Sequence, residues 1–188
     1  MPINKFPRLH RRSIRLQGYD YSEDGAYFLT ICTKDRECLF GAIEHGIIRL
    51  NQFGNIVHDE LLKTLEIRSE IELDSLVIMP NHIHVITVIN RGNDVFRTDD
   101  ICFRRGDRPV APTGHRSGPK SQSIGSFVAG FKSAVTKRAN VIRGNTGGAV
   151  WQRNYYEHIV RDEKSLSNIR TYIMENPRKW EEDELFVE

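Results

Sequence analysis

The sequence predicts an α+β fold: a ferredoxin-like split βαβ sandwich, in which two helices pack on an antiparallel sheet and a further C-terminal helix carries Tyr172. Strand-like and helix-like segments follow one another in the order β, helix, ββ, helix, β, helix. The length of 188 residues favours a single domain, 1–188, with a sizeable core. No apolar run approaches the roughly 18 residues that cross a bilayer.

The first predicted strand lies at 26–33 (AYFLTICT), which is rich in β-branched and aromatic residues. A short strand is expected at 47–50. Asn51 then offers a side-chain cap for a helix that reaches about Glu66, because apolar residues recur there every three or four positions. This helix is the expected first crossover.

Two strongly apolar segments come next, at 73–79 and 82–89. Both predict strands, and Pro80 and Asn81 separate them. The pair fits either an antiparallel hairpin or a sharply bent continuation of one strand.

The last part of the chain predicts a helix, a strand and a final helix. The first of these helices is expected at about 123–143, and the strand at 150–160. Asp162 is a suitable cap for the final helix, 163–175, which an Asn-Pro pair ending at Pro177 should stop.

Charge is distributed unevenly around a net value of +2. Residues 1–16 hold five bases and no acid, within an expected N-terminal arm, 1–20. Residues 91–122 hold four Gly, three Pro and seven Lys or Arg, and predict a mobile surface loop. Residues 181–188 form an acidic tail with five acids. A basic arm can neutralise phosphates, although a solvated, frayed terminus is the simpler interpretation.

The cysteines are Cys32, Cys38 and Cys102, an odd number without CxxC spacing. They fit neither a disulfide framework nor a zinc motif, and they suit a reducing cytoplasm. The N-terminus has no apolar segment of the kind that secretory signals contain. We therefore expect a cytoplasmic protein.

His82 and His84 form the sharpest local pattern. Residues two apart on a strand point to the same face, so both imidazoles should project together while Ile83 points away. Two imidazoles so placed can chelate one divalent metal ion. A pair of satisfied or exposed histidines is the alternative.

Tyr172 and Asn176 lie one turn apart on the predicted final helix and can face one site together. Alternatively, Tyr172 is a tyrosine at the edge of the core and Asn176 only caps the helix. Residues 151–158 (WQRNYYEH) interleave aromatic and polar side chains. Such a strip can stack bases and contact phosphates, or its aromatic residues can fill the core.

Taken together, these segments resemble the single-tyrosine HUH transposases, in the branch of the REP-associated tyrosine transposases and their insertion-sequence relatives. The resemblance covers nearly the whole chain and weakens only in the predicted loop. Its motifs occur at 15–21 (RLQGYDY), 30–33 (TICT), 79–85 (MPNHIHV), 151–161 (WQRNYYEHIVR) and 172–177 (YIMENP).

The resemblance implies metal-dependent cleavage and rejoining of single-stranded DNA near hairpins. It places a divalent ion, Mg²⁺ or Mn²⁺, on His82 and His84. It makes Tyr172 the nucleophile, which forms a 5′-phosphotyrosine intermediate. Asn176 would complete the metal site, at a position where several relatives have Gln. Tyr155 and Tyr156 are the competing tyrosines.

The resemblance also implies hairpin-bearing single-stranded DNA as the partner, and leaves monomer and homodimer open. The rival hypotheses are a domesticated transposase and a non-catalytic nucleic-acid binder with a ferredoxin-like sheet. Expected DNA contacts are Arg8, Arg11, Arg12, Arg15, Lys132, Lys137, Arg138, Arg153 and His158.

Overall fold

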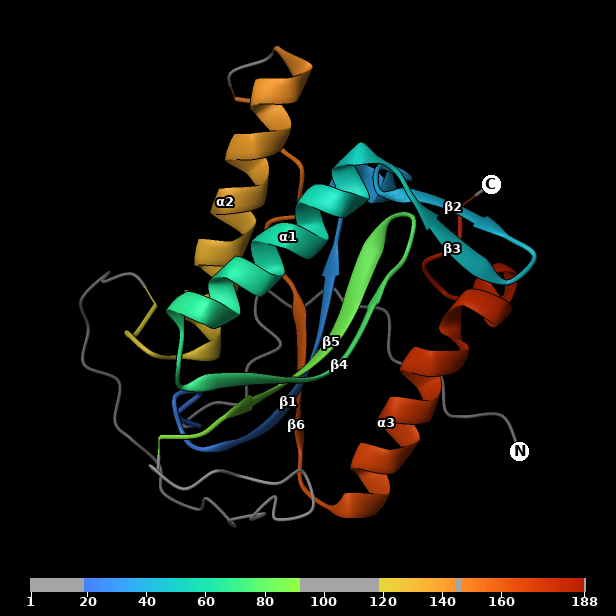
Figure 1. Ribbon diagram of the computed structural model, residues 1–188. Helices are drawn as coiled ribbons and strands as arrows, with labels where there is room; N and C mark the ends of the chain where they lie inside the picture. Colours follow the sequence, from blue (N-terminus) through green and yellow to red (C-terminus); the bar gives the residue numbers. More distant parts are fainter. Residues whose placement is uncertain (1–18, 92–118, 145–146, 188) are drawn as a thin grey trace.

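A computed structural model describes residues 19–91, 119–144 and 147–187 (Figure 1). Most of the predicted arm and loop therefore lies outside the described residues, and so do the predicted DNA contacts Arg8, Arg11, Arg12 and Arg15. Within the described ranges, every helix is too short or too polar to span a lipid bilayer.

Four strands form the main sheet, in the spatial order β4-β5-β1-β6 with every neighbouring pair antiparallel. This is the strand order of a ferredoxin-like split βαβ sandwich and confirms the predicted fold class. The direct antiparallel pairing of β4 with β5 selects the hairpin for the two apolar segments. The strands are β1 (Gly25–Cys32), β4 (Ile71–Ile78), β5 (His82–Ile89) and β6 (Tyr156–Val160).

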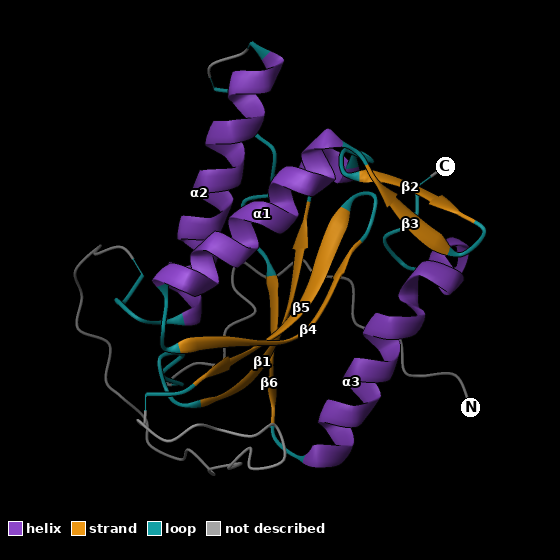
Figure 2. Cartoon of the chain, viewed as in Figure 1, coloured by secondary structure: helices purple, strands orange, loops and turns teal. Residues whose placement is uncertain are grey.

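In the part of the chain that the structure describes, three α-helices cover the two faces of this sheet (Figure 2). Helices α1 (Gln52–Ile67) and α2 (Ile124–Arg143) share one core, and α3 (Glu163–Glu175) packs in the other. The two predicted caps, Asn51 and Asp162, are present, and Ser123 caps α2 in the same way, because each side chain accepts a backbone N–H of the first helical turn.

The alternation of side chains along β1 and β5 decides what each face carries. Leu29 of β1 and Ile83 of β5 point into the core beneath α1 and α2. Phe28 points into the opposite core, beneath α3. His82 and His84 have the same parity as the residues beneath α3. The helix that carries Tyr172 therefore covers the face that carries both histidines.

The strand predicted at 150–160 is wrong in its first half. Strand β6 starts only at Tyr156, and Trp151 makes a single isolated bridge to Thr33. The Lys132 ammonium donates to two carbonyl oxygens of the intervening segment, at 2.8 and 3.0 Å. These bonds hold that segment against α2 instead of in the sheet.

Two further details differ from the prediction. The short strand β3 (Ile47–Leu50) pairs with β2 (Gly41–Glu44), which has little sequence signal. The Asn-Pro pair ends α3 but not the helical path, because a 3-10 helix, η3 (Asn176–Glu182), continues from it. Proline fits the first turn of a helix, where its missing N–H has no partner to lose.

A short 3-10 turn, η1 (Lys34–Arg36), follows β1.

Candidate active site

The two histidines of β5 lie side by side in the described structure. Their Nε2 atoms are 3.0 Å apart, and both side chains are buried. The outer nitrogens have separate partners: His82 Nδ1 lies 2.8 Å from Asn81 Oδ1, and His84 Nδ1 lies 2.8 Å from Thr30 Oγ1. Both rings are therefore held by their Nδ1 atoms, with the Nε2 atoms turned towards each other.

Helix α3 brings Tyr172 to this pair. Its hydroxyl lies 3.1 Å from His84 Nε2 of the same chain. Its ring packs edge-on against Phe28, with 6.2 Å between the ring centroids. Tyr172 is 44% exposed, whereas His84 is only 2% exposed. The phenol is therefore the part of the site that solvent, or a large substrate, can reach.

An ion pair fixes α3 on the sheet. Arg170 donates to both carboxylate oxygens of Asp74, from Nε at 2.9 Å and from Nη2 at 2.5 Å. The Asp74 side chain is 3% exposed. The register of β4 with β5 shifts between Leu73 and Ser75, and this irregularity falls at Asp74. This Arg170–Asp74 ion pair, called the clamp below, lies less than one helical turn from Tyr172.

We expect Arg170→Met to lower the free energy of unfolding by about 2 kcal/mol, because it leaves a buried carboxylate without its cation. This value is below that of a fully buried pair, since Arg170 is one-third exposed. Urea unfolding measures the change. The matched control is Arg49→Met in an exposed pair with Glu44, for which we expect at most about 0.5 kcal/mol. Equal losses in the two variants would show that the clamp contributes nothing.

Asp183 completes the site and was not among the residues predicted from sequence. Its Oδ2 accepts from Tyr172 Oη at 3.3 Å and from Asn176 Nδ2 at 2.8 Å. One ligand atom each of His82, His84 and Asp183 lies within 4.8 Å of the other two. Asp183 belongs to the predicted acidic tail, so part of that tail folds back onto the site.

Asn176 gives the clearest indication that the cluster suits a cation. Its side chain is 3% exposed, and its Oδ1 has no hydrogen-bond partner among the described residues. An orphaned buried oxygen costs free energy unless something binds it. Two imidazole nitrogens, a carboxylate and an amide oxygen are a donor set for a divalent metal ion. The residues present therefore fit the ion that the sequence resemblance implies.

Burial determines the proton affinities in the site. It lowers the pKa of His82 to about 4 and holds the pKa of His84 well below its usual value. Burial, and then the charge of Asp183, raise the pKa of the Tyr172 phenol. The metal-free site thus holds two neutral imidazoles beside a phenol whose pKa lies above its ordinary value.

These directions predict a pH-dependent stability for the metal-free protein. Between pH 6.5 and about 4 the unfolded chain protonates its histidines while the folded protein does not. The free energy of unfolding should therefore fall as the pH falls through this window, by about 1.4 kcal/mol per pH unit for each buried histidine. Urea unfolding in EDTA measures this slope. The double variant His82→Gln, His84→Gln should flatten it, and an unchanged slope would contradict the prediction.

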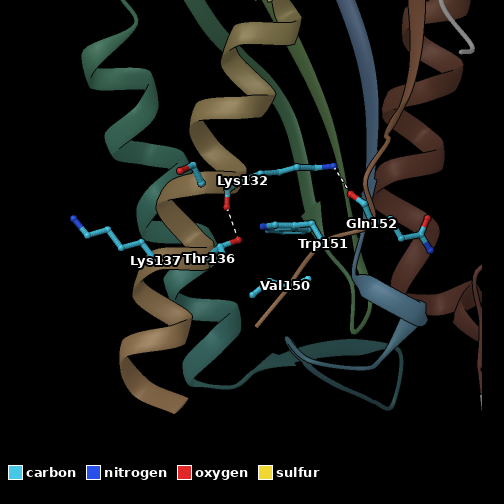
Figure 3. Close-up of a pocket in the computed structure, with 8 residues that line it drawn as sticks. Lys132, Thr136, Lys137, Val150, Trp151 and Gln152 are labelled. Carbon is cyan, nitrogen blue, oxygen red and sulfur yellow. Dashed lines mark hydrogen bonds between the residues drawn. The ribbon is translucent and has the colours of Figure 1, made fainter. Parts of the chain in front are cut away.

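The predicted DNA contacts Lys132, Lys137 and Arg138 belong to α2, which packs on the face of the sheet opposite to the histidine pair. Lys132 and Lys137 line a cavity of about 490 Å³ between α2 and residues 149–152 (Figure 3). In this view Lys137 points away from Trp151, while Lys132 reaches across to the carbonyl of Gln152. Burial lowers the pKa of Lys132 to about 8.

The other predicted contacts are spread over the surface. Arg138 pairs with Asp59 and Glu60 of α1, at 3.3 and 2.7 Å. Arg153 and His158 are exposed. His158 pairs with Phe28 across the sheet and thus shares the face of the site.

The competing tyrosines, Tyr155 and Tyr156, have different surroundings in the structure. Lys132 lies over the ring of Tyr155, at 5.7 Å from its centroid. Tyr156 pairs with Thr30 and packs in the core beneath α3, with its ring 6.4 Å from that of Phe28. The hydroxyl of Tyr172 lies 3.1 Å from His84 Nε2, and this contact favours Tyr172 among the three tyrosines.

Comparisons with known proteins find related chains. The sequence is 42% identical over 180 residues to an uncharacterized protein of Haemophilus influenzae, covering 95% of this chain and 94% of that protein. It is 24% identical over 164 residues to a candidate REP-associated tyrosine transposase of the same organism, covering 85% of this chain and 74% of that protein. No family model matches.

The fold resembles that of a REP-associated tyrosine transposase solved in complex with a REP hairpin. The TM-score is 0.55 at 17% sequence identity, covering 92% of this chain and 74% of that chain. At this identity, the comparison establishes a shared fold.

Proposed function

We propose that this protein cleaves and rejoins single-stranded DNA, because the chain belongs to one family with its 42% identical relative from Haemophilus influenzae and also resembles the REP-associated tyrosine transposases. The similarity supports a DNA-processing protein of the transposase type. The finer proposal is a metal-dependent endonuclease and strand transferase that acts near DNA hairpins through a 5′-phosphotyrosine intermediate.

One observation carries this proposal: the hydroxyl of a half-exposed tyrosine lies 3.1 Å from a buried histidine pair that fits a divalent cation. A phenol is a weak nucleophile at neutral pH, and burial weakens its acidity further here. When bound, a divalent ion polarises the scissile phosphate and neutralises the charge that develops on it. The donor set of His82, His84, Asp183 and Asn176 is suited to hold Mg²⁺ or Mn²⁺ beside the phenol.

Tyr172 attacks the phosphorus through Oη in the proposed reaction. The 3′-oxygen of the preceding nucleotide leaves and takes a proton from water to give a free 3′-hydroxyl, and the 5′-phosphate remains on the tyrosine. Asp183 Oδ2, which accepts the phenol hydrogen bond at 3.3 Å, is placed to receive the proton. Because the covalent link conserves the free energy of the phosphodiester, the reverse attack by a 3′-hydroxyl rejoins DNA without ATP.

The proposed site is assembled within one chain, since Tyr172 contacts the histidine of its own β5. This favours action in cis and does not require a homodimer. Hairpin DNA is the proposed partner, because the solved structural relative is a complex with a REP hairpin. The exposed Arg153 and His158, and the basic arm with Arg8, Arg11, Arg12 and Arg15, are proposed to contact the DNA backbone.

The test uses labelled single-stranded hairpin oligonucleotides from the sequences that flank the gene. The protein is incubated with each oligonucleotide in Mn²⁺, Mg²⁺ or EDTA and analysed on a denaturing gel. A covalent protein–DNA band that requires the metal supports the proposal. Tight hairpin binding without any covalent band would instead indicate a non-catalytic or domesticated DNA-binding protein.

A further inference from the structure

Asn81 is buried, and its hydrogen bonds fix which way its amide points. Nδ2 donates to two backbone carbonyl oxygens, those of Arg36 at 3.2 Å and Leu185 at 2.7 Å. Both amide hydrogens are thereby used, so Oδ1 is the atom that lies 2.8 Å from His82 Nδ1. An amide oxygen can only accept. The proton of neutral His82 must therefore be on Nδ1, which leaves a lone pair on Nε2, facing the site.

Thr30 does not constrain His84 in the same way. Its hydroxyl lies 2.8 Å from His84 Nδ1 and can rotate, so it can donate to a bare nitrogen or accept from an N–H. On the other side of the ring, His84 Nε2 lies 3.0 Å from His82 Nε2. Since the latter carries a lone pair, a hydrogen bond at this distance requires the proton of His84 to be on Nε2.

The remaining contacts agree with this arrangement. Tyr172 Oη, 3.1 Å from His84 Nε2, donates its own hydrogen to Asp183 Oδ2 at 3.3 Å and can share the His84 N–H as an acceptor. In the chain of contacts that connects Thr30, the two histidines, Tyr172 and Asp183, every N–H and O–H donor then has an acceptor. A protonated His84 Nε2, however, has no lone pair for a metal ion.

We propose that Asn81 locks His82 in its Nδ1–H tautomer, whereas Thr30 allows His84 to change from Nε2–H in the metal-free protein to Nδ1–H when a divalent cation binds. The proton lost from Nε2 is matched by one gained at Nδ1, so the imidazole stays neutral. Thr30 and Asn81 are thus positioning residues for the pair. This inference rests on the proposed metal site, but the metal-free tautomers can be read before any ion is added.

Long-range ¹H–¹⁵N NMR spectra of ¹⁵N-histidine-labelled protein at pH 8 test the proposal, with Zn²⁺ as the diamagnetic probe. We expect Nδ1–H for His82 and Nε2–H for His84 in EDTA, and Nδ1–H for both in Zn²⁺. An Nε2–H signal for metal-free His82 would overturn the proposal that Asn81 locks its tautomer. If His84 keeps Nε2–H while Zn²⁺ binds, only the proposed tautomer change of His84 is overturned. If Zn²⁺ does not bind, the change and the proposed metal site both fail, and the lock is still decided in EDTA.

Two isosteric variants test the role of Thr30 without reference to activity. Thr30→Val removes the acceptor for His84 Nδ1–H, so we expect the affinity for Zn²⁺ to fall by about tenfold or more. Thr30→Ser keeps a hydroxyl and should restore most of the affinity.

Thr87→Val is the matched control. Thr87 lies on the same strand but the opposite face, and its buried hydroxyl has no partner among the described residues. This variant should bind Zn²⁺ as tightly as the unaltered protein. Equal affinities for Thr30→Val and Thr87→Val would overturn the proposal.

Discussion

Tyr172→Phe should abolish the covalent protein–DNA band while leaving hairpin binding and folding nearly intact. The variant removes only the hydroxyl, which is the proposed nucleophile, and keeps the ring that packs on Phe28. Because the side chain is 44% exposed, we expect the free energy of unfolding to change by at most about 1 kcal/mol. The adduct is measured on a denaturing gel in Mn²⁺, and hairpin affinity by fluorescence anisotropy.

Tyr156→Phe is the matched control for this experiment. Tyr156 lies beneath the same helix, and the same hydroxyl is removed, but Tyr156 pairs across the sheet with Thr30 and is not one of the three residues His82, His84 and Asp183. This variant should form the adduct at close to the normal rate. An adduct that persists in Tyr172→Phe and disappears in Tyr155→Phe or Tyr156→Phe would assign the nucleophile to the segment before α3.

Asp183→Asn should weaken Mn²⁺ binding by at least about tenfold, which corresponds to about 1.4 kcal/mol. The substitution keeps the shape of the side chain but removes the one carboxylate of the cluster, whose other members are neutral imidazoles. It also removes the proposed proton acceptor of Tyr172, so adduct formation should remain slow even at saturating Mn²⁺. Calorimetry with Mn²⁺ and adduct rates over a Mn²⁺ series measure the two effects separately.

Glu182→Gln removes the same charge one residue earlier. Glu182 lines the small cavity of about 140 Å³ beside Tyr172 but is not a member of the three-residue cluster. We expect its Mn²⁺ affinity to stay within about twofold of the unaltered protein, since charges exposed to solvent contribute little. Equal Mn²⁺ affinities for Asp183→Asn and Glu182→Gln would exclude Asp183 as a ligand. Adduct formation by Asp183→Asn that is as fast as in the unaltered protein at saturating Mn²⁺ would exclude Asp183 as the proton acceptor.

Local signals explain why much of the fold is predictable from sequence. Asn51, Ser123 and Asp162 each precede an apolar pattern of helical period, and each caps a helix in the structure. The two-residue spacing of His82 and His84 likewise determines that they share a face. Such features depend on residues close together in the chain, so a single sequence contains the information.

The features that were missed depend on contacts between distant residues. Asp183 enters the site because η3 continues past Pro177 and turns the tail back towards β5, and nothing in an acidic C-terminal run indicates that one carboxylate is half-buried. Trp151 and Tyr155 are strand-forming residues, yet Lys132 of α2 binds the carbonyls of Gln152 and Asn154 between them and holds this segment out of the sheet. Tertiary hydrogen bonds of this kind override local propensity.

Peptide mapping of the protein–DNA adduct tests the central claim most directly. Cleavage after Lys and Arg releases residues 171–178 (TYIMENPR), which contain Tyr172 as their only tyrosine, and residues 154–161 (NYYEHIVR), which contain both competing tyrosines. After nuclease digestion of the DNA, mass spectrometry identifies the peptide that retains a 5′-nucleotide. We expect the added mass on 171–178, at Tyr172, and only in samples that contained the divalent metal. A nucleotide on 154–161 would contradict the proposed site.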